Sequence, residues 1–272
     1  MRLRAHGTSK SMLSGVDSFG VPITGPNYDC LCVGPFVGTH SVGLELDSES
    51  SFFRKYGLLV AVADAEPDDG AVTPSQIFLE ELSSRFYAWD HVGDDPNSVR
   101  RGVIAHLDDA HQALLSRMAD EERTSAIATA AGFALFEPDI AIVFHIGDCR
   151  VLRESTGYLR ALTADHVSDR IPALSLMDKA EQIKDREPEL THYMGLLGAG
   201  EPEIRMHRWC AGDTFVVGTK GWHNIYDGFG PAAMKTSLFA HPEPRDFVEH
   251  SSNESLTADR RHDCTVAMVR VS

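Results

Sequence analysis

This sequence has no long hydrophobic run and little positive charge. No apolar stretch approaches the roughly 20 residues that a membrane-spanning helix needs, and the basic residues Arg2 and Arg4 are not followed by the apolar core of a signal peptide. We therefore expect a cytoplasmic protein. Lysine and arginine number 25 against 40 aspartate and glutamate residues, a formal net charge of -15. Because such a surface repels phosphate backbones, nucleic acid and anionic membranes are poor candidate partners.

Cysteine is also scarce. The five cysteines are Cys30, Cys32, Cys149, Cys210 and Cys264, and no Cys-x-x-Cys pair occurs. A zinc site of the usual cysteine spacing is therefore not expected, and buried free thiols in a reducing compartment are the simplest interpretation. The chain has 272 residues, 43% of them hydrophobic, so it can bury a large core without a disulfide or metal.

The order of apolar segments predicts one α+β domain over residues 1–272. Strands are expected at 29–37, 57–63, 125–136, 140–146, 151–153, 205–209, 214–217 and 264–271, and helices at 74–89, 99–118, 173–184, 221–226 and 245–251. Residues 1–25 are rich in Gly, Ser and Pro and are expected to form an irregular arm or an edge strand. The middle of the chain has the turn spacing of antiparallel hairpins, which favours two sheets between helix layers.

Three apolar strands carry an acidic or polar turn at one end. Asp64 follows 60–63, Lys220 follows 216–219, and Asp263 precedes the last strand. Hard divalent cations need several carboxylates brought together from separate rigid elements, and strand ends supply such positions. A single aspartate beside a strand is more often a turn residue, so the chemistry depends on the segments taken together.

Taken together, the short motifs form a recognisable series. In order they are Asn27-Tyr28-Asp29, Val62-Ala63-Asp64-Ala65, Thr124-Ser125, Gly147-Asp148-Cys149-Arg150, Leu162-Thr163-Ala164-Asp165-His166, Gly212-Asp213, Thr219-Lys220-Gly221 and Asp263-Cys264-Thr265. In this order and spacing the chain resembles the metal-dependent protein phosphatase 2C (PPM) family over nearly its whole length. The resemblance implies a four-layer α-β-β-α sandwich of two antiparallel sheets flanked by helices. It also implies two Mn²⁺ or Mg²⁺ ions that activate a water against phosphoserine or phosphothreonine.

The resemblance assigns roles to individual residues. Asp64 matches the carboxylate that bridges the two metals, and Ala65 matches a glycine whose backbone carbonyl is a ligand. Asp263 matches the carboxylate of the last strand, and Asp148 is a further candidate metal ligand. Asp29 matches the acid that holds metal-bound water. Asp64, Asp263 and Asp29 are thus the candidate catalytic residues.

Three departures from the family pattern weaken this assignment. Lys220 stands in place of a metal-binding aspartate, Asn224 replaces an acid four residues later, and Thr24 stands where the family has a phosphate-binding arginine. A dication about 4 Å from an ammonium is repelled by roughly 8 kcal/mol at an effective dielectric of 20. We therefore expect the Lys220 ammonium to take a metal's place and neutralise Asp64 and Asp263. The alternative is that Lys220 points to solvent.

Other polar residues near these motifs have more than one interpretation. The turn at 66–70 contains three further acids, which either recruit one cation or form a solvated loop. A packing role is favoured for His145, His166 and His223, although His223 is also a candidate proton donor or ligand. Trp222 is expected to fill core space at the start of a helix.

Two functions follow from the resemblance. The favoured one is a pseudophosphatase, a binding or regulatory module that recognises a phosphorylated protein or a kinase partner. The alternative is an active Mn²⁺- or Mg²⁺-dependent phosphoserine/phosphothreonine phosphatase with an altered site that holds a single ion. An unrelated hydrolase on the same scaffold is a third, weaker hypothesis, because fold alone does not determine function.

Overall fold

The computed structural model describes residues 1–16, 22–67, 70–123, 127–168, 189–195, 200–229, 231–258 and 262–272. Its helices are α1 (Ser51–Tyr56), α2 (Pro74–Ala88), α3 (Pro96–Asp120), α4 (Lys220–Phe229), α5 (Pro231–Ala240) and α6 (Pro244–Ala258). Its longer strands are β1 (Arg2–Lys10), β4 (Cys30–Val33), β5 (Phe36–Gly38), β6 (Val42–Asp47), β7 (Leu58–Ala65), β8 (Ala128–Phe136), β9 (Ile140–Ile146), β10 (Arg150–Ser155), β11 (Tyr158–Ala161), β14 (Glu203–Arg208), β15 (Thr214–Gly218) and β16 (Cys264–Val271). Two small hairpins are β2 (Leu13–Val16) with β3 (Pro22–Thr24), and β12 (Val167–Ser168) with β13 (Glu189–Leu190).

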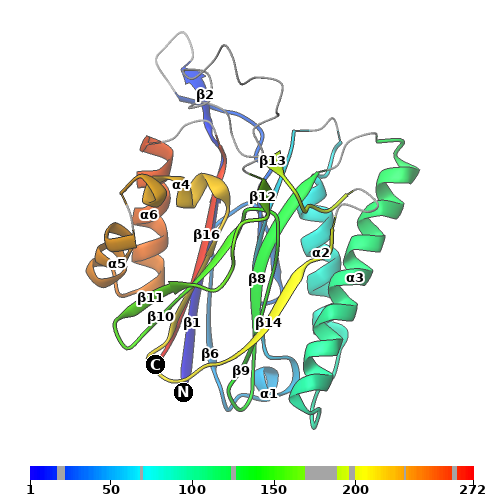
Figure 1. Ribbon diagram of the computed structural model, residues 1–272, viewed down its shortest axis with the longest axis vertical. Helices are drawn as coiled ribbons and strands as arrows, with labels where there is room; N and C mark the ends of the chain where they lie inside the picture. Colours follow the sequence, from blue (N-terminus) through cyan, green and yellow to red (C-terminus); the bar gives the residue numbers. More distant parts are fainter. Residues whose placement is uncertain are drawn as a thin grey trace.

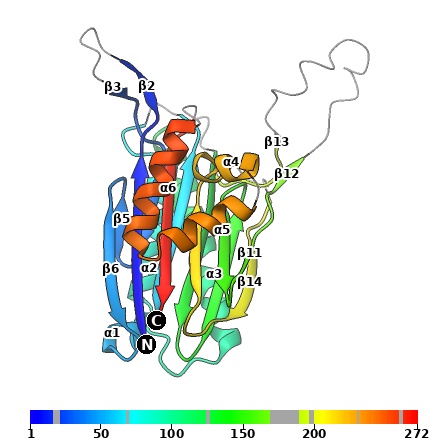
Figure 2. The same cartoon turned by 90° about the vertical axis from the view of Figure 1, so that its left-hand side faces the viewer.

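Two six-stranded antiparallel sheets form the centre of the molecule. One has the strand order β11-β10-β15-β16-β1-β6 and the other β14-β9-β8-β7-β4-β5. Helices α4, α5 and α6 cover the outer face of the first sheet, and α2 and α3 cover the outer face of the second (Figures 1 and 2). The predicted four-layer α-β-β-α sandwich is therefore confirmed.

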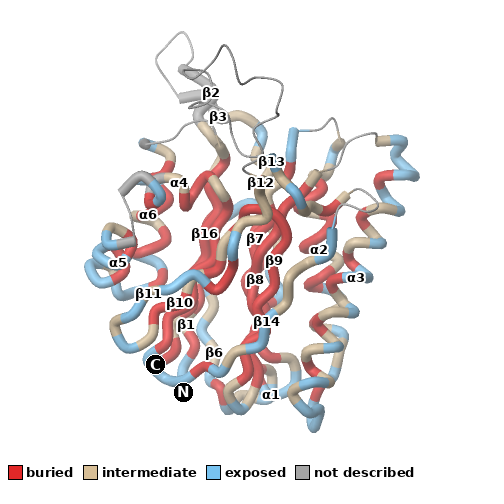
Figure 3. The backbone as a smooth tube through the Cα atoms, in the orientation of Figure 1, coloured by how far each residue is buried: buried red, intermediate tan, exposed pale blue. Residues whose placement is uncertain are grey.

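Strand β7 is apolar from Leu58 to Ala63 because both of its faces are buried there (Figure 3). Val60 and Val62 point into the core between the sheets, whereas Ala61 and Ala63 pack toward α2 and α3. A strand covered on one side only would alternate polar and apolar residues. Each buried valine or leucine contributes roughly 1.5–3 kcal/mol to stability.

The helices begin where the sequence supplies caps. The Thr73 hydroxyl accepts from the Gln76 backbone N–H at 3.2 Å, and Pro74 is the first residue of α2. Asp95 caps α3 in the same way and is also followed by a proline. Proline fits this position because its missing N–H would have no partner inside the helix. Both predicted long helices are confirmed.

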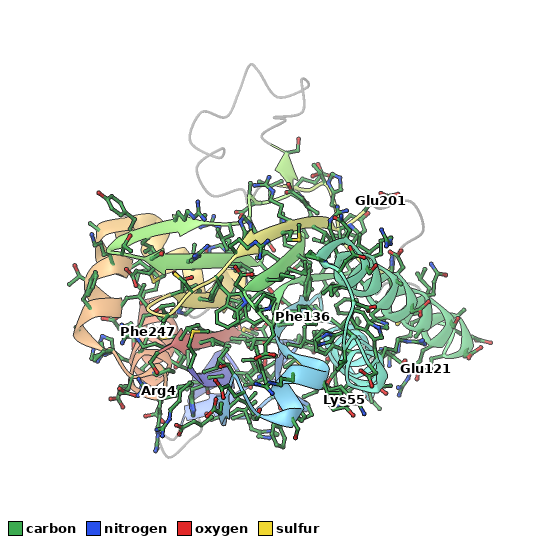
Figure 4. All side chains as sticks on the ribbon, turned by 90° about the horizontal axis from the view of Figure 1, so that it is seen from below. Arg4, Lys55, Glu121, Phe136, Glu201 and Phe247 are labelled. Carbon is green, nitrogen blue, oxygen red and sulfur yellow. The ribbon has the colours of Figure 1, made fainter. Side chains whose placement is uncertain are left out.

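Aromatic side chains tie the helix layers to the sheets. Trp222 is fully buried, and its indole N–H donates to the Ser251 hydroxyl at 3.1 Å, which joins α4 to α6. The predicted core role of Trp222 is thus confirmed. Phe247 and Phe136 belong to the two outer cores and lie on opposite sides of the sheets when the molecule is seen from below (Figure 4).

The N-terminal residues do not form the expected irregular arm or edge strand. Residues 2–10 form β1, an interior strand that pairs with β16 on one side and β6 on the other. The prediction was wrong because polar and buried residues alternate along β1. Its composition is therefore that of a surface segment, although the strand lies inside the sheet. Segment 29–37 is likewise a hairpin, not one strand, since Gly34 turns the chain at φ 61°.

Several smaller predictions can also be compared with the structure. Cys30, Cys32, Cys149 and Cys264 are buried free thiols as expected, but Cys210 is exposed. Helices α1 and α5 were not predicted, and the expected helix at 173–184 lies outside the described residues, as does Thr124-Ser125. Among the helices in the described part of the chain, none has the length and apolarity to span a membrane.

Candidate functional site

Four acids, one from each of four strand ends, lie close together. One of these strands is β16, which begins at the end of the sandwich remote from both chain termini (Figure 1). Asp64 lies at the end of β7, Asp29 immediately before β4, Asp148 between β9 and β10, and Asp263 immediately before β16. Neighbouring antiparallel strands place the end of one beside the start of the next, so these positions share one edge. Lys220, the first residue of α4, follows β15 to the same edge.

Asp263 is held by backbone groups from two distant segments. Its Oδ1 accepts from the Met12 N–H at 2.8 Å and its Oδ2 from the Tyr28 N–H at 2.7 Å. Burial raises the pKa of Asp263, whereas the Met12 and Tyr28 N–H groups lower it. Hydrogen bonds to a charged group contribute about 1.5–3 kcal/mol each, so Asp263 fastens both segments to β16.

Asp29 is fully buried and only partly satisfied. Its Oδ2 accepts from the Thr219 hydroxyl at 2.8 Å, and its backbone N–H donates to Asn27 Oδ1 at 3.1 Å. Its Oδ1 is buried without a hydrogen-bond partner among the described residues. Thr219 was part of a predicted motif but had no predicted role, and its position directly before Lys220 was the signal that could have suggested one.

The Asp29 and Asp64 carboxyl groups lie close enough for each to affect the pKa of the other. Burial raises the pKa of Asp29 to about 7, and the charge of Asp263 adds to the shift. Burial also raises the pKa of Asp64 well above its usual value, with further contributions from Asp29 and Asp148. Two carboxylates this close cannot both ionise cheaply, so without a cation the pair retains a proton near neutral pH.

Lys220 is paired with an acid other than the two predicted. Its Nζ lies 3.6 Å from Asp148 Oδ2, and the two side chains are only 19% and 9% exposed. The predicted partners were Asp64 and Asp263, with Lys220 in solvent as the alternative; the Lys220 side chain is instead largely enclosed. A cation at a helix N-terminus opposes the helix dipole, so Asp148 also offsets that cost for α4.

A polar network fixes the turn that carries Asp148. His223 Nε2 hydrogen-bonds the Asp148 carbonyl at 2.8 Å, and His223 Nδ1 lies 3.4 Å from Asp227. Arg150 makes a bidentate pair with Asp165 at 2.7 Å and contacts Asp227 at 2.5 Å. The predicted packing role of His223 thus includes support of Asp148. The Arg150–Asp165 pair joins two neighbouring motifs of the predicted series.

The remaining predicted residues lie around this cluster. Ala65 is buried at the end of β7, opposite Ala128. Asn224 is half-buried on α4, and Thr24 ends β3, where nothing is described of its side chain. Glu66 in the acidic turn is exposed, and residues 68–69 lie outside the described residues.

Comparison with known proteins identifies the fold. No protein-family model and no curated protein matches the sequence. Solved structures match over the whole chain: the S. agalactiae serine/threonine phosphatase has a TM-score of 0.71 and 18% identity, covering 98% of this chain and 100% of that one. The PPM Ser-Thr phosphatase MsPP from Mycobacterium smegmatis, in complex with cacodylate, has a TM-score of 0.65 and 20% identity, covering 98% of both chains.

A third match is the catalytic domain of the serine threonine protein phosphatase PstP in complex with two manganese ions. It has a TM-score of 0.67 and 15% identity, and the match covers 100% of this chain and 99% of that one. The TM-scores establish a shared fold, but sequence identities this low do not transfer the activity. The chemistry therefore has to be argued from the residues of this chain. The chain therefore has the fold of the PPM serine/threonine phosphatases over its full length.

Proposed function

We propose that this protein is a pseudophosphatase, a PPM-fold module that binds a phosphorylated protein or a kinase partner and has lost dimetal hydrolysis. The observation that carries the proposal is the enclosed Lys220–Asp148 ion pair at 3.6 Å. An ammonium at this distance from a candidate metal ligand repels a dication by several kcal/mol. The acid at Asp148 is then already neutralised.

The donors that remain fit one divalent cation better than two. Both oxygens of Asp263 accept backbone N–H groups, and Asp148 faces Lys220. Asp64 and Asp29 are left as acids, and a cation would replace the proton that burial and their proximity favour. When bound, Mn²⁺ or Mg²⁺ would lower the pKa of a water molecule. The chain's own contribution is to hold Asp29 through Thr219 and to place Asp64 beside it.

A cavity beside the acid cluster is suited to part of a binding partner. Its volume is about 530 Å³. His223 lines this cavity and also hydrogen-bonds the Asp148 carbonyl. Apolar side chains such as Leu159 and Met234 line it together with Arg160. Arg150 is held by its acid partners, whereas Arg160 is exposed at the cavity and can offer its charge to a phosphate.

One observation favours the alternative of an active enzyme with a single ion. The buried Asp29 Oδ1 has no hydrogen-bond partner among the described residues, and it belongs to a cluster of four acids. A buried polar atom without a partner costs about 1–3 kcal/mol, which a bound cation or water would relieve. An Mn²⁺- or Mg²⁺-dependent phosphoserine/phosphothreonine phosphatase therefore remains the second candidate.

Calorimetric titration with Mn²⁺, combined with p-nitrophenyl phosphate turnover, separates the two functions. We expect weak or absent Mn²⁺ binding and no turnover by the wild-type chain. A phosphoserine peptide should still bind, and Arg160→Ala should weaken that binding about tenfold or more, whereas replacement of the exposed Arg245 on α6 should not.

Micromolar Mn²⁺ binding with turnover that Asp64→Asn abolishes would refute the pseudophosphatase and establish the active enzyme. Turnover that persists in Asp64→Asn would point to a contaminating phosphatase. Failure of phosphoserine peptides to bind at all would remove the proposed partner class.

A further inference from the structure

Three ligand-bearing side chains meet outside the acid cluster. One ligand atom from each of His145, His166 and Glu203 lies within 4.8 Å of the other two. Two imidazoles and a carboxylate form a donor set typical of zinc. We propose that these three residues form a site for Zn²⁺ or a similar borderline transition metal. This site does not depend on the activity of the acid cluster.

The fold brings the three residues together by strand register. Glu203 on β14 is the direct partner of His145 on β9, so the two side chains stand on the same face of the sheet. His145 Nε2 lies 3.8 Å from Glu203 Oε2. His166 comes from the segment before β12 and its ring contacts that of His145 in a tilted arrangement, with centroids 4.2 Å apart. The donors therefore come from separate, firmly placed elements.

Both histidine rings make hydrogen bonds that a metal would displace: His145 donates an N–H, and His166 accepts with a ring lone pair. His145 Nε2 hydrogen-bonds the Ala164 carbonyl at 2.7 Å, and His166 Nδ1 accepts the Gly147 N–H at 3.3 Å. A ring nitrogen that accepts a hydrogen bond carries no proton, so the His166 ring is neutral. The neutral imidazole is the form that binds metal. Metal binding would break these two hydrogen bonds, at about 1 kcal/mol each. The metal affinity is then roughly 30-fold lower than at a site without such bonds. We therefore expect micromolar affinity, not the tighter binding of a dedicated structural zinc site.

A metal here would fasten the β12–β13 hairpin to the sheet. His166 directly precedes β12. His192 follows β13, and its ring contacts that of His166 with centroids 4.5 Å apart. The Thr191 N–H donates to the His166 carbonyl at 2.8 Å, which joins the two ends of the hairpin. β14 is the edge strand of the second sheet. The site thus links the base of a hairpin to a sheet edge.

The two clusters should prefer different metals. The acid cluster offers oxygen ligands only, which suit Mg²⁺ and Mn²⁺, whereas imidazole favours zinc and cobalt. Arg205 contacts Glu203 through its other oxygen, with Nε 2.7 Å from Oε1, and so competes for part of its charge. Glu203 Oε2 is the atom left to face His145.

The test is calorimetric titration of the full chain with Zn²⁺ alone, repeated with Co²⁺ to record the visible absorption of the bound ion. Glu203→Gln keeps the shape of the side chain and removes its charge. The matched control is Glu201→Gln, an exposed glutamate at the edge of the molecule two residues earlier (Figure 4). We expect one Zn²⁺ per chain, at least tenfold weaker binding in Glu203→Gln, and no change in Glu201→Gln.

A second readout guards against misfolding. Zn²⁺ should raise the melting temperature of the wild type and of Glu201→Gln more than that of Glu203→Gln. His145→Ala should also lose binding, but it removes a buried ring and is used only if it folds. Equal Zn²⁺ binding by wild type and Glu203→Gln would overturn the proposal. So would binding that Asp64→Asn abolishes and Glu203→Gln does not, since the ion would then lie in the acid cluster.

Discussion

The charge at position 220 controls what the acid cluster can hold. Lys220 places one positive charge 3.6 Å from Asp148, in a position that is largely shielded from water. A carboxylate there would change the local charge by two units and reverse its sign. The remaining acids and their supporting hydrogen bonds would stay in place, because Thr219 and the backbone hold Asp29 and Asp263.

Lys220→Asp is therefore expected to increase the affinity for Mn²⁺ by at least tenfold, since an attraction replaces a repulsion of several kcal/mol. Lys220→Met removes the charge alone and should give a smaller gain. Without metal, Lys220→Asp should melt at a lower temperature than the wild type, and Mn²⁺ should restore it. Calorimetry measures the Mn²⁺ affinity and thermal melts measure the stability. An unchanged Mn²⁺ affinity would show that Lys220 is not what prevents Mn²⁺ from binding.

The buried Asp29 makes stability depend on pH. Its pKa is about 7 in the folded protein against an ordinary value of 3.8, so the folded state binds the proton more tightly than the unfolded state. The penalty for ionising Asp29 is absent below pH 4, grows as the pH rises toward 7, and is fully present above it. For a shift of this size it reaches ~4 kcal/mol at most.

Asp29→Asn should therefore gain stability relative to the wild type as the pH rises from 4 to 8, in the presence of a chelator. The comparison between variants matters because burial also lowers the pKa of several histidines, such as His145 and His91, and their effect has the opposite sign. Thr219→Val removes the hydrogen bond to the Asp29 carboxylate and should lose stability over the same range. Chemical denaturation at each pH measures this, and parallel curves would contradict it.

At the scale of elements, α4 is packed directly against the chain before β16. A Cβ atom on Gly221 would lie 1.9 Å from the Asp263 carbonyl oxygen. Glycine is required there by the close approach of the helix to a backbone atom that cannot move aside. The start of α4, which carries Lys220, is thereby positioned by the same segment that carries Asp263.

Gly221→Ala should consequently destabilise the protein by about 1–3 kcal/mol, the usual cost of overpacking. It should also disturb the Lys220–Asp148 pair. The matched control is Gly38→Ala, where the added Cβ would meet only the exposed His40 ring, which can rotate away. Denaturant titration of both variants gives the comparison, and equal stabilities would show that α4 can shift without cost.

At the scale of the whole molecule, the two sheets share one core. Phe133 from one sheet packs against Phe215 from the other with ring centroids 5.1 Å apart, within a cluster that both sheets build. β1 and β16, from the two ends of the chain, pair over eight residues. Neither sheet can bury its inner face without the other.

We therefore predict a single cooperative unfolding transition, as expected for one domain over residues 1–272. Scanning calorimetry should give equal calorimetric and van't Hoff enthalpies, and Phe215→Ala should lower the midpoint without splitting the transition. Two separate transitions, or an enthalpy ratio well above one, would contradict the prediction of a single domain.

The fold was largely predictable from the sequence because its signals are local. Apolar runs such as 57–63 and 140–146 mark strands buried on both faces, and helical spacing of apolar residues predicted α2 and α3, although α3 begins at Pro96 and not at 99. β1 was missed because an alternating strand of nine residues resembles a polar arm until its partners are known. Local composition does not reveal whether a strand will lie inside a sheet or at its edge.

The sequence by itself determined which acids the site contains, since Asp29, Asp64, Asp148 and Asp263 all sit at strand ends in a recognisable order. Only the tertiary structure decided how they are paired. Asp263 receives its two N–H groups from residues 251 and 235 positions away, and Lys220 reaches Asp148. Such contacts depend on register and packing between sheets, and no local pattern encodes them.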